Sequence, residues 1–220
     1  MYEKRCRYGA LYGNYGQLVF RAWSWSLLPK ITRILTVTQI GKKVLNGELT
    51  LRHSQNSYDW LGHGVYFWES SPERAYQFAE QSSQRQQSTV KKPFVIGAII
   101  DLGICLDLLD KKWLDFLREA YDQLILGLDE AGKELPANSA FGENDFDFKK
   151  RELDCSVIRY AVELAEREQN IKFDSVRAAF WEGEELYPQA GFKTHNHIQL
   201  SIINPDCIKG IFLPRQKTNS

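Results

Sequence analysis

Residues 58–79 read YDWLGHGVYFWESSPERAYQFA, and this stretch decides the fold expected for the chain. The segment GVYFW at residues 64–68 combines branched and aromatic side chains directly after a glycine, which predicts a short strand. Ser70 followed three residues later by Glu73 has the spacing of a capping box, and Pro72 is tolerated in a first helical turn. A strand, a tight turn and a helix are therefore expected to follow one another here.

The segments downstream of this unit carry periodic patterns of their own. The helix after the strand is expected to end near residue 86. A branched apolar run at residues 93–102 predicts a central strand, and the spacing of apolar residues predicts helices at residues 106–128 and about 149–167. Strand character then returns in three segments, at residues 175–181, 197–203 and 208–213. Strands, then helices, then strands again are typical of an α+β fold.

The composition describes a chain that can form a real core. It has 220 residues, of which 43% are hydrophobic, and its 28 basic side chains equal its 28 acidic ones. We expect a single domain over residues 1–220, and no membrane contact, because no apolar stretch approaches the roughly 20 residues of a spanning helix. Four scattered cysteines and four histidines without ligand spacing argue against a disulfide framework and a metal site. Without a secretion signal, we expect a cytoplasmic protein.

The N-terminal side has an uneven charge. Residues 1–39 are expected to form an arm of short extended pieces, followed by a short helix that stops at Asn46-Gly47. The first 40 residues hold six basic side chains against Glu3, an excess of +5, interleaved with four tyrosines and two tryptophans. Such a segment is typical of surfaces that stack on bases and neutralise phosphates. The alternative, which the usual solvation of basic residues favours, is a turn-rich lead-in whose tryptophans join the core.

Several polar residues are candidates for binding or chemistry. Gly62 and Gly64 permit a close backbone approach to a ligand. His63 between them could contact a pyrophosphate or an amide, or simply hold the glycine turn. On the strand expected at residues 197–203, alternation places His197 and Gln199 on one face. That face either borders a cleft or is satisfied by neighbouring strands.

The pattern G-x-G-V-Y-F, followed by Ser, Ala and an aromatic residue on the next helix, resembles the second motif of the poly-ADP-ribose-polymerase-like branch of the ADP-ribosyltransferase superfamily. The resemblance implies a split, mostly antiparallel β-sheet with a helical insertion at about 105–170, and NAD as a substrate. Tyr66 matches the tyrosine that stacks on nicotinamide, and Tyr76 or Phe78 approximates the second stacking aromatic. The NAD-binding residues implied in this way are Gly62, His63, Gly64, Tyr66 and Tyr76.

Residues 54–69 and 180–215 together are similar to a bacterial subgroup of these transferases that is often associated with toxin or phage-defence systems. The likeness covers roughly residues 40–215. It implies a toxin-like enzyme that transfers ADP-ribose from NAD to a macromolecule, releases nicotinamide, and has a cognate antitoxin protein as a partner. The basic, aromatic arm favours a nucleic acid, RNA or DNA, over protein as the acceptor.

Two positions depart from the family pattern. The first motif normally carries a histidine that binds the adenosine ribose, whereas ILTVTQIGKKVL at residues 34–45 has none. The ribose contact is therefore either missing, supplied by another residue such as Arg33, Thr36 or Thr38, or lost through alteration of the N-terminal region. The third motif normally carries a glutamate, whereas the strand HIQL at residues 197–200 has none. Gln199 cannot act as a carboxylate base, which favours an exocyclic amine as acceptor or a transfer assisted by His197.

A carboxylate could come from elsewhere in the chain. The acidic cluster of Glu182, Glu184 and Glu185 precedes the strand HIQL, and it either supplies the missing group or forms a solvated loop. Arg74 and Arg85 on the helix after residue 70 could approach phosphates. The alternative to an enzyme is a catalytically inactive ADP-ribosyltransferase-like module that binds NAD or nucleic acid.

Overall fold

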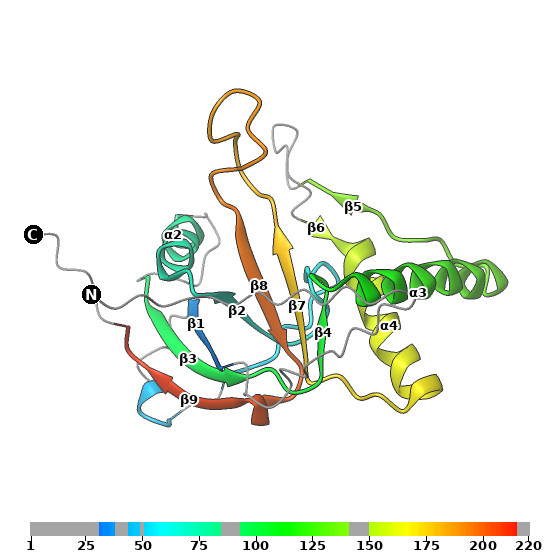
Figure 1. Ribbon diagram of the computed structural model, residues 1–220, viewed down its shortest axis with the longest axis horizontal. Helices are drawn as coiled ribbons and strands as arrows, with labels where there is room; N and C mark the ends of the chain where they lie inside the picture. Colours follow the sequence, from blue (N-terminus) through cyan, green and yellow to red (C-terminus); the bar gives the residue numbers. More distant parts are fainter. Residues whose placement is uncertain (1–30, 38–43, 49–50, 85–92, 141–149, 215–220) are drawn as a thin grey trace, which may run out of the picture.

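A computed structural model describes residues 31–37, 44–48, 51–84, 93–140 and 150–214, the first of these ranges by its backbone (Figure 1). Within these ranges, seven strands form one sheet in the order β4-β7-β8-β2-β1-β3-β9. The strands are β1 (Ile31–Val37), β2 (Val65–Glu69), β3 (Val95–Asp101), β4 (Cys105–Asp107), β7 (Ser175–Phe180), β8 (His197–Ile202) and β9 (Ile208–Phe212). The helices are α2 (Pro72–Ser83), α3 (Lys111–Glu130) and α4 (Glu152–Gln169). The expected α+β class is confirmed.

The sheet is mostly antiparallel, as expected, because only β4 and β7 pair in parallel among its neighbouring strands in the described ranges. The ladder between β1 and β2 has two residue pairs, whereas β1 and β3 share seven. This short ladder separates β4-β7-β8-β2 from β1-β3-β9. Two small strands, β5 (Asn138–Ser139) and β6 (Lys150–Arg151), pair with each other outside the sheet.

A small hydrophobic cluster joins Trp68 of β2 to Ala75 of α2, and two larger clusters hold the other described elements together. One lies between the two parts of the sheet and includes Phe67 of β2, Ile100 of β3 and Leu200 of β8, each with no exposed surface. The other packs α3 and α4 against β4 and β7, around Leu106 and Phe173. Figure 1 shows α3 and α4 together on one side of the molecule and α2 on the other. The helical pair therefore occupies the segment that was expected to be helical.

The helix expected at residues 106–128 begins later than predicted. Cys105–Asp107 form β4, and Leu106 is fully buried in the sheet. The helix starts after Asp110, whose side chain accepts a hydrogen bond from the backbone N–H of Lys112. Residues 106–110 were assigned wrongly because the short apolar run of a buried strand blends into the helical period that follows it.

The capping box expected at Ser70 and Glu73 is also wrong. Ser70 has a left-handed backbone (φ 52°) that turns the chain out of β2. The N-cap is Ser71, whose side chain makes no capping hydrogen bond, and the helix begins at Pro72. The restricted φ of proline suits a first helical turn, so the helix starts at the proline rather than at a side-chain cap.

Two further expectations have clear outcomes. The strand at residues 93–102 forms β3, which has a neighbour on each side but lies one place from the edge of the sheet, not at its centre. The stop at Asn46-Gly47 is confirmed, since Gly47 has φ 72° and its N–H bonds to Val44 O. None of the helices in the described residues has the length and apolar character that crossing a bilayer requires.

Candidate functional site

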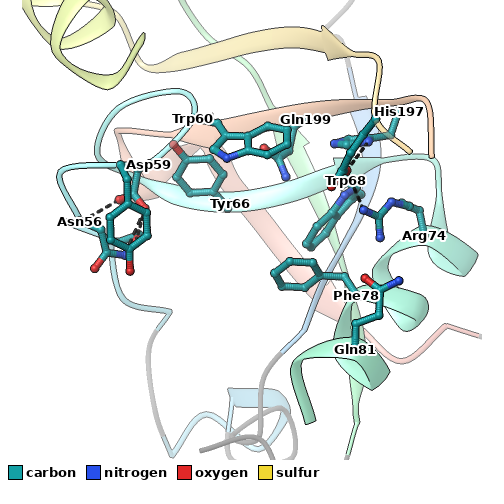
Figure 2. A pocket seen from close by; sticks show the side chains of 13 residues that line it. Asn56, Asp59, Trp60, Tyr66, Trp68, Arg74, Phe78, Gln81, His197 and Gln199 are labelled. Atoms are coloured by element: carbon teal, nitrogen blue, oxygen red, sulfur yellow. Dashed lines mark hydrogen bonds and ion pairs between the residues drawn. The ribbon is translucent and has the colours of Figure 1, made fainter. Parts of the chain in front are cut away.

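One pocket lies where β2, α2, the start of β8 and the loop before β2 meet (Figure 2). It has a volume of about 320 Å³. Aromatic, charged and amide side chains line it: Ser54, Asn56, Tyr58, Asp59, Trp60, Tyr66, Trp68, Arg74, Phe78, Gln81, Glu182, His197 and Gln199. Both sequence blocks that carried the motifs therefore contribute to a single cavity.

The ring of Tyr66 lines this pocket, and its hydroxyl already makes two hydrogen bonds within the protein. The hydroxyl donates to Gly62 O at 2.6 Å and accepts from the backbone N–H of Leu61 at 2.7 Å. Burial raises the pKa of the Tyr66 phenol well above its ordinary value. The hydroxyl thus holds the loop before β2, while the ring is the part of Tyr66 that can contact a ligand.

The other aromatic walls come from the neighbouring strand positions and from α2. Trp68 of β2 and Phe78 of α2 pack at 4.9 Å between ring centroids. Of the two candidates for a second stacking aromatic, Phe78 lines the pocket, whereas Tyr76 is 46% exposed and does not. Residues two positions apart on a helix point in nearly opposite directions, so the side of α2 that packs against Trp68 carries Phe78.

His197 and Gln199 both line the pocket, as their alternation predicted. In the strand register, Gln199 pairs with Trp68 of β2, and His197 pairs with Phe180 of β7. Leu200 is fully buried in the cluster between the two parts of the sheet. The polar face of β8 therefore borders a cavity rather than another layer of the core.

The imidazole of His197 is buried, with 1% of its side chain exposed. Its Nδ1 lies 2.7 Å from His195 O, a carbonyl that can only accept, which assigns the proton to Nδ1. Burial lowers the pKa of His197, and the nearby Arg74 guanidinium lowers it further. Nε2 has no partner among the described residues, so it carries a free lone pair.

Glu182 is the member of the acidic cluster that reaches the pocket. It is buried and pairs with Arg74 of α2, with 2.7 Å between Glu182 Oε2 and Arg74 Nη2. Glu184 and Glu185 are exposed. The turn after Glu182 uses Gly183 at φ 90°, where a Cβ would lie 2.4 Å from Thr194 Oγ1, so this glycine keeps the β7–β8 hairpin tight beside the pocket.

The polar rim of the pocket comes from residues 54–60, which belong to the block at residues 54–69 but were not expected as site residues. The carboxylate of Asp59 accepts hydrogen bonds from Ser54 Oγ, from the backbone N–H of Asn56 and from Asn56 Nδ2, at 2.9–3.1 Å. Trp60, at the end of this loop, also lines the pocket. The loop's mixture of Ser, Asn and Asp is the usual signal for such a turn, but it does not reveal that the turn borders a cavity.

Gly62, His63 and Gly64 do not line the pocket. A Cβ on Gly64 would lie 2.3 Å from Ser201 Oγ, and one on Gly62, at φ 73°, would lie 3.3 Å from Arg159 Cγ. Both glycines thus allow close approach of β8 and α4. His63 is half-buried, and partial burial together with Arg159 lowers its pKa. These three residues were expected to contact a ligand, but they lie outside this cavity.

Other candidates lie outside the described residues. These are Arg85, Thr38, the side chains of Arg33 and Thr36, and most of the basic, aromatic arm. Within the described ranges, no group of three His, Cys, Asp or Glu side chains is arranged to hold a metal ion, and Cys105, Cys155 and Cys207 form no disulfide bond with one another. Comparison with family models, curated proteins and solved structures found no match to this chain.

Proposed function

We propose that this protein is a toxin-like NAD-dependent ADP-ribosyltransferase with the split, mostly antiparallel sheet of that superfamily. The proposal is carried by one observation: a single pocket brings together the ring of Tyr66, the ring of Phe78 and the polar face of β8. Tyr66 and the face of β8 come from residues 54–69 and 180–215, which resemble the family, and Phe78 comes from the helix that follows the glycine motif. The short β1–β2 ladder and the α3–α4 pair are compatible with the proposed fold.

The nicotinamide end of NAD suits the aromatic part of the pocket. Tyr66 and Trp60 line one part of the wall, and Trp68 and Phe78 line another (Figure 2). A planar aromatic ring gains from stacking, which is worth roughly 1–3 kcal/mol for a base on an aromatic side chain. The amide of Gln199, which also lines the pocket, can both donate and accept hydrogen bonds.

The proposed transfer breaks the bond between C1′ of the ribose and N1 of nicotinamide, and the electron pair leaves with nicotinamide. Positive charge then develops on the sugar, and a nearby carboxylate or amide oxygen stabilises it. We assign this role to Glu182 together with Gln199. An acceptor amine or hydroxyl forms the new bond to C1′, and its proton passes to Nε2 of His197.

The test is to incubate the full chain with NAD and measure released nicotinamide, then to follow labelled NAD in a cell lysate treated with nuclease or protease. We expect release and a labelled macromolecule. Tyr66→Ala should remove most of both, whereas Tyr76→Ala, a tyrosine on the same motif but outside the pocket, should leave them largely unchanged. Absence of NAD binding by the folded protein would contradict the proposal.

A second candidate function is an inactive module that binds NAD without turnover. One observation in its favour is that the third-motif strand carries the neutral Gln199 instead of a glutamate. Another is that Glu182, the buried carboxylate near His197 among the described residues, is already paired with Arg74. This module would be favoured over the enzyme if the chain binds NAD but gives neither released nicotinamide nor labelled product, even when lysate is present.

A further inference from the structure

Arg74 has more hydrogen-bond donors than its surroundings satisfy. Its side chain is 7% exposed, and Nη2 donates to Glu182 Oε2 at 2.7 Å. Nε and Nη1 are buried and have no partner among the described residues. Buried polar groups in proteins are nearly always hydrogen-bonded, and a buried guanidinium is costly when its donors are not used. The unused donors therefore indicate an acceptor that these residues do not supply.

The environment of Arg74 favours an anion. Arg74 lies in the first turn of the 12-residue helix α2, where the helix dipole attracts negative rather than positive charge. The indole Nε1 of Trp68 is also buried and has no partner among the described residues. Both side chains line the pocket, and Figure 2 shows Arg74 reaching from α2 toward Trp68. Two side chains with unused donors, from two different elements, thus line the same cavity.

Glu182 supplies the negative charge next to Arg74 in this structure, and an incoming oxyanion would compete with it. The hairpin after β7 holds the backbone of Glu182, because the N–H of His195 donates to Glu182 O, and Oε2 lies 3.8 Å from His197 Nδ1. Exchange of partners at Arg74 would therefore leave Glu182 beside the imidazole.

We propose that Arg74 and the indole N–H of Trp68 form a subsite for a phosphate group, and that Glu182 balances the charge of Arg74 until the phosphate binds. The phosphate subsite does not depend on the reaction assigned above. Its consequence, that phosphate binding releases the Glu182 carboxylate to face the ribose, rests on the proposed function.

The probe is inorganic pyrophosphate, titrated calorimetrically into the full chain. Arg74→Gln should weaken binding about tenfold or more, because charge-assisted hydrogen bonds are lost. Trp68→Phe should weaken it about three- to tenfold, since this change removes one N–H and keeps a ring. Glu182→Gln should strengthen it, because the competing charge is gone. Arg167→Gln, on the exposed side of α4, is the matched control and should change nothing.

Two competition arms identify the source of the phosphate. ADP-ribose displaces pyrophosphate if NAD supplies the group, and a single-stranded RNA dinucleotide displaces it if the acceptor does. Circular dichroism shows which variants are folded. If Arg74→Gln does not fold, Trp68→Phe tests the subsite.

Lack of pyrophosphate binding by the wild type, or binding that folded variants of Arg74 and Trp68 leave unchanged, overturns the subsite. NAD turnover without pyrophosphate binding counts against the subsite alone. Pyrophosphate binding without turnover in any acceptor mixture counts against the proposed enzyme alone.

Discussion

The hydroxyl and the ring of Tyr66 have different roles. Its hydroxyl links to Leu61 N and Gly62 O, while its ring faces the pocket. Tyr66→Ala should weaken NAD binding about 5- to 100-fold through loss of stacking. Tyr66→Phe keeps the ring but leaves a buried N–H and C=O unpaired, so it should lower the free energy of unfolding by about 1–3 kcal/mol with little change in NAD affinity.

Calorimetry measures the affinity for NAD, and urea denaturation measures the free energy of unfolding, so the two effects are separated. Equal loss of NAD affinity in both variants would show that the loop held by the hydroxyl, and not the ring, makes the contact. Tyr76→Ala serves as the control for a surface tyrosine of the same motif.

His197 makes stability depend on pH in a defined direction. Burial lowers its pKa below 6.5 in the folded protein, with Glu182, Arg74 and His195 as the charged or titratable neighbours that act on it. In the window just below pH 6.5 the unfolded chain binds the proton and the folded protein does not. The contribution of His197 to the free energy of unfolding should therefore be fully present above pH 6.5. As the pH drops below 6.5, the free energy of unfolding should fall by at most about 1.4 kcal/mol per pH unit for this group.

Urea denaturation at several pH values between 5 and 8 measures this slope. His197→Gln should flatten it, while His63→Gln, at a less buried histidine whose pKa is also lowered, should have a smaller effect. An unchanged slope in His197→Gln would mean that other groups cause the acid dependence.

At the scale of the elements, one arginine connects three strands. Arg177 of β7 contacts Glu69 of β2 at 2.6 Å through Nε, and Asp107 of β4 at 3.2 Å through Nη1. These side chains are only 14–19% exposed. Arg177→Gln leaves two poorly solvated carboxylates together, so it should lower the free energy of unfolding by about 3 kcal/mol.

The matched change Arg118→Gln disrupts an exposed pair with Asp122 on α3 and should cost less than about 0.5 kcal/mol. Thermal or urea denaturation compares the two variants. Equal small losses would show that the Arg177 cluster is no stronger than a surface ion pair.

The boundaries of the elements show where local patterns are sufficient. The strands at residues 175–181, 197–203 and 208–213 were predicted to within about two residues, because alternation and flanking turns are local features. The starts of α2 and α3 were misplaced because Ser70 takes a left-handed backbone and Leu106 belongs to β4. The second depends on a neighbour that is distant in the sequence, because Leu106 pairs with Val176 of β7.

At the scale of the whole molecule, the charge distribution favours a nucleic acid as the acceptor of the proposed transfer. The first 40 residues carry an excess of +5. We predict that single-stranded RNA or DNA binds with a log–log salt slope of about −0.7 for each phosphate neutralised. Arg5→Glu combined with Arg7→Glu should reduce nucleic-acid labelling but not nicotinamide release, since both positions lie outside the motifs of the pocket.

Filter binding across a salt series and labelling in lysate measure the two outcomes. Affinity that does not change with salt, or label recovered only in protein after nuclease treatment, would contradict a nucleic-acid acceptor. Neither result would argue against NAD as the donor.

The sequence alone determined the α+β class, the strand–turn–helix unit around Tyr66, and the shared face of His197 and Gln199. These follow from periodicity and turn chemistry, which act over a few residues. Only the tertiary structure decided that Phe78 rather than Tyr76 faces the pocket, and that Glu182 meets Arg74. The last two residues are 108 positions apart, and their contact depends on how β7, β8 and α2 pack, which no local pattern encodes.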